Sequence, residues 1–246
     1  MNLALELNVL LPALLAGLLV LATHVPLGQE VLKRGIVFID LAIAQVAVLG
    51  VIAAEVLGFE AHGWAVQAIA ATAALAGAAL LSYAERRFAA QQEALIGALF
   101  VLAASAALLL LHGHAHGAEH LKDVLEGQIL WTEIRTLLPV ALLYAAVLAL
   151  WFGARRRLGR AGFYFLFALT VTASVQLVGV YLVFASLIIP VLAAPRLPFA
   201  YALGALAYAA GLTLSLIADL PAAPVIVCLL ALLGAAVWRF APSVRR

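Results

Sequence analysis

Seven long stretches of this chain contain no acidic or basic side chain, and this pattern restricts the fold more than any other feature. The stretches cover residues 7–29, 61–84, 94–118, 136–154, 161–195, 197–218 and 220–238. A helix needs roughly 20 mostly apolar residues to cross the hydrocarbon core of a membrane. In lipid the backbone hydrogen bonds must be satisfied within the protein, as they are in a helix. The pattern therefore predicts an all-α, polytopic transmembrane helical bundle.

The composition agrees with this fold class. Of the 246 residues, 67% are hydrophobic and 11% are charged, whereas a soluble domain is about a quarter charged. The short segments of alternating polarity that form transmembrane barrels are absent. We expect one transmembrane domain over residues 1–246, with about eight or nine helices. Their predicted spans are 5–27, 36–57, 64–83, 93–111, 136–153, 162–177, 179–193, 199–217 and 222–240.

The stretch 161–195 needs its own interpretation, because its length fits neither one span nor two full ones. A single helix of 35 residues would be about 52 Å long, too long for one crossing. Gly179 and Pro190 interrupt the stretch, and proline disrupts a helix interior. We therefore predict two short helices joined near residues 176–179.

The distribution of basic residues predicts the orientation of the chain, because Lys and Arg accumulate on the cytoplasmic side. With nine helices, 12 of the 14 basic residues fall on one side. These are Lys33, Arg34, Arg86, Arg87, Arg155, Arg156, Arg157, Arg160, Arg196, Arg239, Arg245 and Arg246. Lys122 and Arg135 fall on the other. We expect a multi-pass protein of the cell (inner) membrane, with its N-terminus outside and its C-terminus in the cytoplasm.

A histidine-rich segment lies on the predicted outer side, in the sequence "LHGHAHGAEHLKD". Its metal-ligand side chains are His112, His114, His116, Glu119, His120 and Asp123. Imidazole and carboxylate groups are ligands for zinc, while two glycines in the segment disfavour a rigid helix. We predict an outer collector of divalent metal, with zinc as the first expectation; the alternative is a solvated loop that binds metal only incidentally.

Two aspartates near helix ends are further candidates. Asp40 lies at the start of the second predicted helix, and an ionisable residue within a span often marks an ion path. The alternative is a solvated residue at the membrane interface, near Lys33 and Arg34. Asp219 opens the sequence "DLPAAP", where it could instead cap the following helix.

Enzymatic and nucleic-acid functions find little support. There is no phosphate-binding loop, so the chain is not expected to hydrolyse ATP itself, and it has no basic domain for nucleic acid. Cys228 is the one cysteine, which excludes an intrachain disulfide. We expect no permanently bound cofactor.

Four stretches carry a resemblance to a known family. In chain order they are "VPLGQEVLKRGIVFIDLAIAQVAVLGV", "GAEHLKDVLEGQILW", "VQLVGVYLVFASLIIPVLAA" and "LSLIADLPAAPVIV". Together they resemble the membrane permeases of ABC transporters for zinc, manganese and iron. The resemblance implies a permease subunit that imports a divalent metal ion, with zinc as the first expectation. It also implies a separate cytoplasmic ATPase, an external metal-binding protein, and a homodimer or a paired permease.

The resemblance carries over to individual residues. Asp40 matches the aspartate of the family's second helix, and Asp219 matches an aspartate in its Leu-Ser-x-x-x-Asp-Leu-Pro stretch. Many members have a histidine four residues after the first aspartate, where this chain has Ala44. Gln45 is a substitute ligand at most, and a weaker one for zinc than imidazole. The segment Pro190–Pro198 resembles a coupling segment that docks on the ATPase.

Three other functions remain open on the sequence alone. The first is a secondary cation transporter driven by an ion gradient, which would need several ionisable groups in mid-membrane. The second is an ABC permease with a non-metal substrate. The third is a structural or assembly protein of the membrane. Co-purification with an ATPase subunit would separate the ABC permeases from the other two classes.

Overall fold

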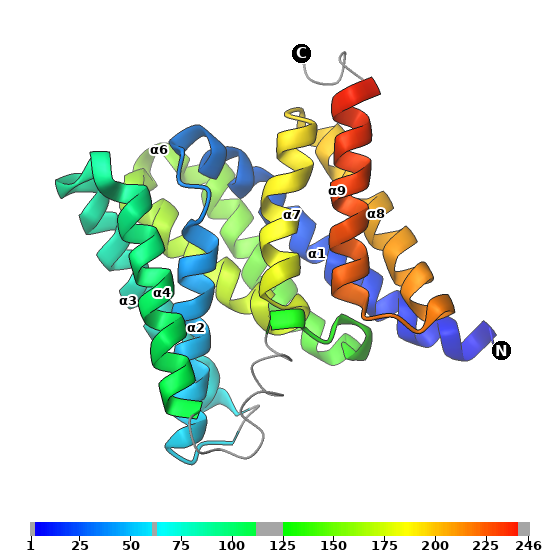
Figure 1. Cartoon of the computed structure of the whole chain (residues 1–246), viewed down its shortest axis with the longest axis horizontal. Helices are drawn as coiled ribbons and strands as arrows, with labels where there is room; N and C mark the ends of the chain where they lie inside the picture. The colour runs from blue at the N-terminus through cyan, green and yellow to red at the C-terminus, as the bar shows by residue number, and fades with distance from the viewer. Residues whose placement is uncertain (1–2, 61–62, 112–124, 241–246) are drawn as a thin grey trace. The chain divides into compact units, whose positions relative to one another are not determined.

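The fold is described from a computed structural model, which describes residues 3–60, 63–111 and 125–240. Throughout these residues the regular structure is helical (Figure 1). The α-helices are α1 Leu3–Arg34, α2 Ile39–Val56, α3 Trp64–Arg87, α4 Gln92–Leu111, α6 Ile134–Val178, α7 Val180–Ala193, α8 Leu197–Ala218 and α9 Ala222–Phe240. Two short 3-10 helices, η1 Ala89–Gln91 and η2 Ile129–Trp131, lie between them.

The predicted fold class is confirmed. Within the described residues, eight segments are long and apolar enough to cross a membrane. Most boundaries agree with the predicted spans to within a few residues. The largest difference is α1, which was expected to end near residue 27 and continues to Arg34. The additional turns are polar, and Arg34 donates to the Glu30 carboxylate one turn earlier at 2.9 Å. Such a pair stabilises a helix end that leaves the hydrocarbon.

The prediction of two helices within 161–195 is also confirmed. Helix α6 is interrupted at Gly159, whose φ of 58° and ψ of −156° are not helical. Its second limb, Arg157–Val178, is long enough to cross a membrane. It ends at Gly179, where φ is 79° and a new helix begins. Helix α7 has 14 residues and is therefore short for a span.

The chain divides into two compact units. Unit 1 consists of Met1–Gly35, Leu125–Ala146 and Ser174–Arg246, and unit 2 of Ile36–Val124 and Val147–Ala173. The predicted single domain, residues 1–246, remains a prediction.

In unit 1, α7 is the central element. It packs against α1, α8 and α9, and α8 also packs against α1 and α9. Figure 1 shows α7 in yellow beside α9 in red. Two pairs of buried hydroxyl groups lie in this unit. The Ser186 hydroxyl of α7 lies 2.8 Å from the Tyr208 hydroxyl of α8, and the Tyr144 hydroxyl is hydrogen-bonded to the Ser174 hydroxyl, joining two parts of α6. Because lipid offers no alternative partner, such internal pairs satisfy buried polar groups.

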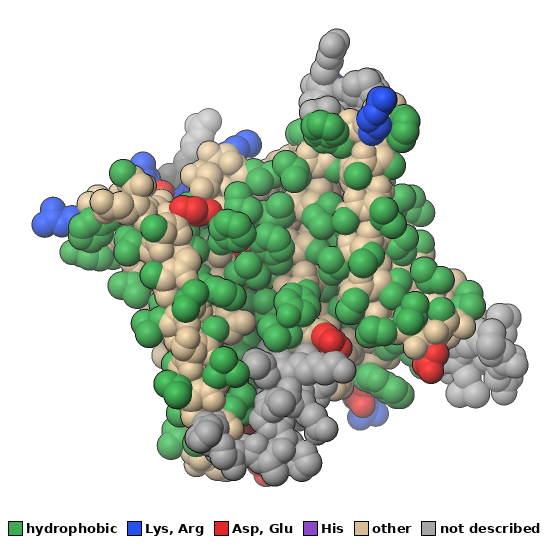
Figure 2. Space-filling model, in the orientation of Figure 1, with side chains coloured by type: hydrophobic (Ala, Val, Ile, Leu, Met, Phe, Trp, Pro, Cys, Tyr) green, Lys and Arg blue, Asp and Glu red, His purple; other side chains and the backbone are tan. Residues whose placement is uncertain are grey.

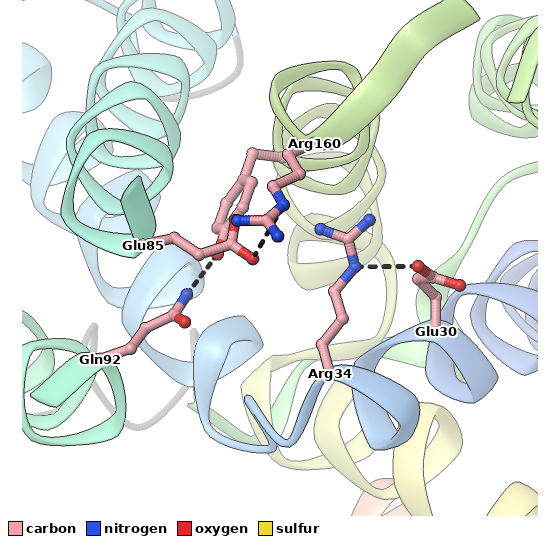
Figure 3. Close-up of polar contacts among 6 residues, drawn as sticks. Glu30, Arg34, Glu85, Gln92 and Arg160 are labelled. Atoms are coloured by element: carbon pink, nitrogen blue, oxygen red, sulfur yellow. Dashed lines mark hydrogen bonds and ion pairs between the residues drawn. The ribbon is translucent and has the colours of Figure 1, made fainter. Parts of the chain in front are cut away.

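In unit 2, α2 packs against α3 and α4. The close approach depends on small residues, since a Cβ at Gly50 would lie 3.0 Å from the Ala70 backbone. The α6 limb is joined to the α3–α4 connection by Gln92, which donates to the Tyr164 hydroxyl at 2.5 Å. Arg160 and Glu85 add an ion pair at 4.0 Å (Figure 3).

The described surface is largely apolar along the helices. Figure 2 shows hydrophobic side chains along α4, α7 and α9, with charged side chains near helix ends. Large side chains such as Leu109, Leu138 and Leu232 are exposed. In water such a surface would be unfavourable, so lipid is the medium that suits it.

Candidate functional site

Asp40 is a buried carboxylate in the first turn of α2, with a side chain only 1% exposed. Neither carboxylate oxygen has a hydrogen-bonded partner among the described residues. The alternative of a solvated interface residue is therefore wrong for this structure. A buried carboxylate without a strong partner is unfavourable, and it is chemically suited to receive a cation.

Gln45 lies on the same helix and is also buried, at 5% exposure. Its amide oxygen has no hydrogen-bonded partner in the described part of the chain. The five-residue separation from Asp40 places the two about 140° apart around the helix. The structure therefore gives α2 two buried oxygen groups on different faces. Gln45 as a substitute ligand remains a prediction.

Asp219 ends α8 rather than starting α9. It is the C-cap of α8 in a left-handed conformation, with φ 52° and ψ 46°, and its side chain is exposed. The expectation that it caps the next helix is therefore wrong, since α9 begins only at Ala222. Aspartate is one of the few residues apart from glycine that adopt this conformation readily. A metal-ligand role for Asp219 remains a prediction.

Ser215 explains the rest of the Leu-Ser-x-x-x-Asp-Leu-Pro stretch. Its carbonyl accepts hydrogen bonds from the amides of Asp219 and Leu220. Its buried hydroxyl donates to the Leu220 carbonyl at 2.6 Å. These bonds satisfy backbone groups at a helix end that have no partner within the helix. These bonds hold the turn between α8 and α9, and we call them the Ser215 clamp.

A cleft of about 220 Å³ opens beside this turn, within unit 1. It is lined by residues 126–131 on one side and by residues 220–224 on the other. These residues belong to the second and fourth of the four stretches that resemble the family, "GAEHLKDVLEGQILW" and "LSLIADLPAAPVIV". The two stretches therefore meet in one cleft, although they lie about 90 residues apart in the chain. Glu126 contributes the one carboxylate of the lining.

A pair of glycines holds the second and third family-like stretches together. Gly127 and Gly179 have φ of 70° and 79°, a region that side chains disfavour. A Cβ on Gly127 would overlap with the backbone of Val178 and Gly179, and one on Gly179 with the backbone of Glu126 and Gly127. The two backbones are in direct contact, so the cleft segment is fixed to the start of α7.

A further close backbone approach joins α1 to α7, and so the first family-resembling stretch to the third. A Cβ on Gly28 would overlap with the carbonyl oxygen of Leu187 in α7. At the same end of unit 1, Gln29 donates to the Pro195 carbonyl at 2.5 Å. The glycine of the Pro-Leu-Gly sequence is therefore required by backbone contact. All four stretches contribute to unit 1, and three of them touch at or next to α7.

The histidine-rich candidates fall outside the described residues. These are His112, His114, His116, Glu119, His120 and Asp123. Among residues 3–60, 63–111 and 125–240, no group of three or more His, Cys, Asp or Glu side chains gathers as a metal site. The collector function remains a prediction.

His24 is a buried residue whose environment the sequence did not reveal. The structure buries it fully in α1. Its Nδ1 lies 2.9 Å from the Val20 carbonyl, so Nδ1 carries the hydrogen in this contact. Its Nε2 has no partner among the described residues. His24 lies on the face of α1 that contacts α7 and α8, together with Gly17, Leu21 and Gly28. The spacing of three or four residues between these positions is the sequence signal that could have identified His24 as buried.

The helices, the apolar surface and the motif contacts together define a multi-pass helical membrane protein. The model of the ABC 3 transport family matches residues 6–163 and 153–240. The chain belongs to the ABC 3 transport family, and it is therefore a membrane subunit of an ABC-type transporter. No match was found among curated protein sequences.

Two solved structures share the fold. One is described as PsaBC from Streptococcus pneumoniae in complex with Fab: the identity is 22%, the TM-score is 0.74, and the match covers 97% of this chain and 92% of the other. The second is described as an inward-facing conformation of a proposed metal-chelate type ABC transporter. Here the identity is 22%, the TM-score 0.65, and the coverage 93% of this chain and 83% of the other.

Proposed function

We propose that this chain is the permease subunit of an ABC transporter that imports a divalent metal ion, with zinc first and manganese or iron as alternatives. Asp40 is the observation that carries the proposal. A membrane-embedded carboxylate with no hydrogen-bonded partner among the described residues is unfavourable unless it serves function. Oxygen ligands are suited to divalent cations of this kind.

The test is metal uptake by cells that lack the native gene and carry either the parent or Asp40→Asn. Asparagine keeps the shape of the side chain and removes its charge. Loss of a ligand worth at least 1.4 kcal/mol lowers binding about tenfold, so we expect a comparable fall in uptake at limiting metal. Because the variant removes a buried carboxylate that has no hydrogen-bonded partner among the described residues, we expect its thermal unfolding temperature to equal or exceed that of the parent.

Glu55→Gln is the matched control, because Glu55 is the other carboxylate of α2 and lies near its opposite end. It should keep nearly parental uptake. Parental uptake in Asp40→Asn at the lowest metal concentration would refute a role for Asp40 in the path. A fall in both variants together with lower amounts of protein in the membrane would indicate a folding effect.

A second candidate cargo is a metal chelate rather than a free ion. Gln45 supports it, because a neutral buried amide is a weak metal ligand but can hydrogen-bond to an organic ligand. The structural relative described as metal-chelate type points the same way. Competition between free metal and preformed chelates in the uptake assay separates the two cargoes.

The partners follow from the same proposal. A separate cytoplasmic ATPase would power transport, an external binding protein would deliver the cargo, and two permease chains would pair. We place the N-terminus outside and the C-terminus in the cytoplasm. The exposed Arg196 lies in the segment Pro190–Pro198 that we assign to ATPase docking. The bond from Gln29 to the Pro195 carbonyl would brace that segment. Co-purification of an ATPase with the tagged permease checks the first partner.

The histidine-rich segment is proposed as an outer collector of divalent metal, separate from the obligatory transport site. Three of its ligands, His112, His114 and His116, can be replaced by serine without placing charge in the membrane. Uptake should then slow at scarce metal and stay parental when metal is plentiful. Equal uptake at the lowest concentration would leave the segment as a solvated loop.

A further inference from the structure

Four described arginines of unit 2 lie at the ends of two helical segments that contact each other. Arg86 and Arg87 end α3, and Arg157 and Arg160 flank the Gly159 break in α6. The ion pair between Arg160 and Glu85 joins these segments, which lie about 70 residues apart in the chain. The hydrogen bond from Gln92 to Tyr164 holds the same junction one turn further on (Figure 3). We call Arg86, Arg87, Arg157 and Arg160 the basic elbow.

The elbow lies at a depth where lipid headgroups are found. The candidate membrane span of α3 ends at Arg87. The candidate span formed by the second limb of α6 begins at Arg157. The contact between Glu85 and Arg160 requires both ends to lie at the same membrane face. Basic residues at the end of a hydrophobic span lie at the boundary between hydrocarbon and headgroups.

The side chains of the elbow are available to a ligand. All four arginines are exposed. The Arg160 side chain is 64% exposed and its contact with Glu85 is long, at 4.0 Å, so most of its donors remain open. Exposed aromatic rings, Tyr83 and Phe88, lie within one turn of the α3 end. Arginine binds phosphate through two parallel hydrogen bonds, and aromatic residues favour the membrane interface.

We infer that the basic elbow is a binding site for the phosphate headgroup of an anionic phospholipid. The positive charge and the position at the end of a membrane span suit a lipid headgroup. The exposed rings of Tyr83 and Phe88 favour a lipid over a soluble anion, because they would pack against acyl chains next to the headgroup. A headgroup that bridges Arg87 and Arg157 would also fasten α3 to the α6 limb, and so stabilise unit 2.

The test uses the purified full chain in neutral detergent, titrated with phosphatidylglycerol or with phosphatidylcholine. Native mass spectrometry measures the bound lipid, and the thermal unfolding temperature reports stabilisation. The elbow variant is Arg86→Gln, Arg87→Gln and Arg157→Gln together, which leaves the Arg160 pair intact. The control is Lys33→Gln, Arg135→Gln and Arg239→Gln, three exposed cations of unit 1 with the same loss of charge.

We expect phosphatidylglycerol to bind the parent and the control, and to bind the elbow variant about tenfold or more weakly. Salt should weaken the interaction with the parent, and lysine at the three positions should restore much of it. Equal phosphatidylglycerol affinity in the elbow variant and the control would overturn the inference, as would equal binding of phosphatidylcholine by the parent. If the elbow variant keeps its lipid but no longer co-purifies with an ATPase, the elbow is a protein-docking surface and the inference is wrong.

Discussion

At the scale of single residues, Asp219 shows how a backbone requirement can resemble a functional motif. It is the one non-glycine residue with positive φ in the described part of the chain. In the sequence, Asp219 matches the aspartate of the family's Leu-Ser-x-x-x-Asp-Leu-Pro stretch. In the structure, it ends α8 next to the Ser215 clamp. The two roles make different demands on the side chain, so substitution separates them.

If ending α8 is the whole role of Asp219, Asp219→Gly should keep parental uptake, because glycine adopts the left-handed conformation without strain. Asp219→Val should lower the free energy of unfolding by about 1–2 kcal/mol, because a branched side chain is strained there. Thermal unfolding of the purified variants and uptake in cells measure the two effects. Loss of uptake in a stable Asp219→Gly protein would instead support the metal-ligand prediction.

At the scale of elements, the close approach of α1 to α7 is the most demanding contact of unit 1. The obstacle at Gly28 is a backbone carbonyl, which cannot move aside as a flexible side chain can. Membrane helices gain packing energy from such approaches, so Gly28 fixes how deeply α7 sits against α1.

Gly28→Ala should therefore destabilise unit 1, by about 1–3 kcal/mol, as overpacked sites do. Gly97→Ala is the matched control, since a Cβ at Gly97 in α4 meets nothing within 4 Å. Alanine is the better helix former by about 1 kcal/mol, so the control should be neutral or more stable. Thermal unfolding in detergent compares them, and equal stability of the two variants would contradict the proposed contact.

At the scale of the whole molecule, the orientation in the membrane is open to direct labelling. We expect Ala115→Cys and Arg157→Cys, each in a Cys228→Ser background, to react with membrane-impermeant thiol reagents from opposite sides. The reason is that the predicted topology puts 12 of the 14 basic residues on one side, which we therefore assign to the cytoplasm. Labelling of both positions from the same side would mean that the segment Ile134–Ala154 between them does not cross the membrane, which would contradict the predicted topology.

The helices were predictable because their signal is local: uncharged stretches of sufficient length mark spans wherever they occur. The break at Gly179 was predictable for the same reason, from length and charge. The site was only partly predictable. Burial of Asp40 depends on packing from distant parts of the chain, and the contact of Gly127 with Gly179 joins residues 52 positions apart. The clamp at Ser215 depends on a left-handed residue four positions later, which the helical pattern does not mark.

The length of α7 has a consequence for the electrical properties of unit 1. Its 14 residues extend about 21 Å, whereas the hydrocarbon core is about 30 Å thick. At least one end of α7 therefore lies within the thickness of the hydrocarbon core, where its polar backbone groups need partners other than lipid. If water were the partner, the transmembrane voltage would fall over a shorter distance beside α7 than through the surrounding lipid. For a doubly charged ion, 100 mV corresponds to about 4.6 kcal/mol, and beside α7 that work would be concentrated into a shorter step.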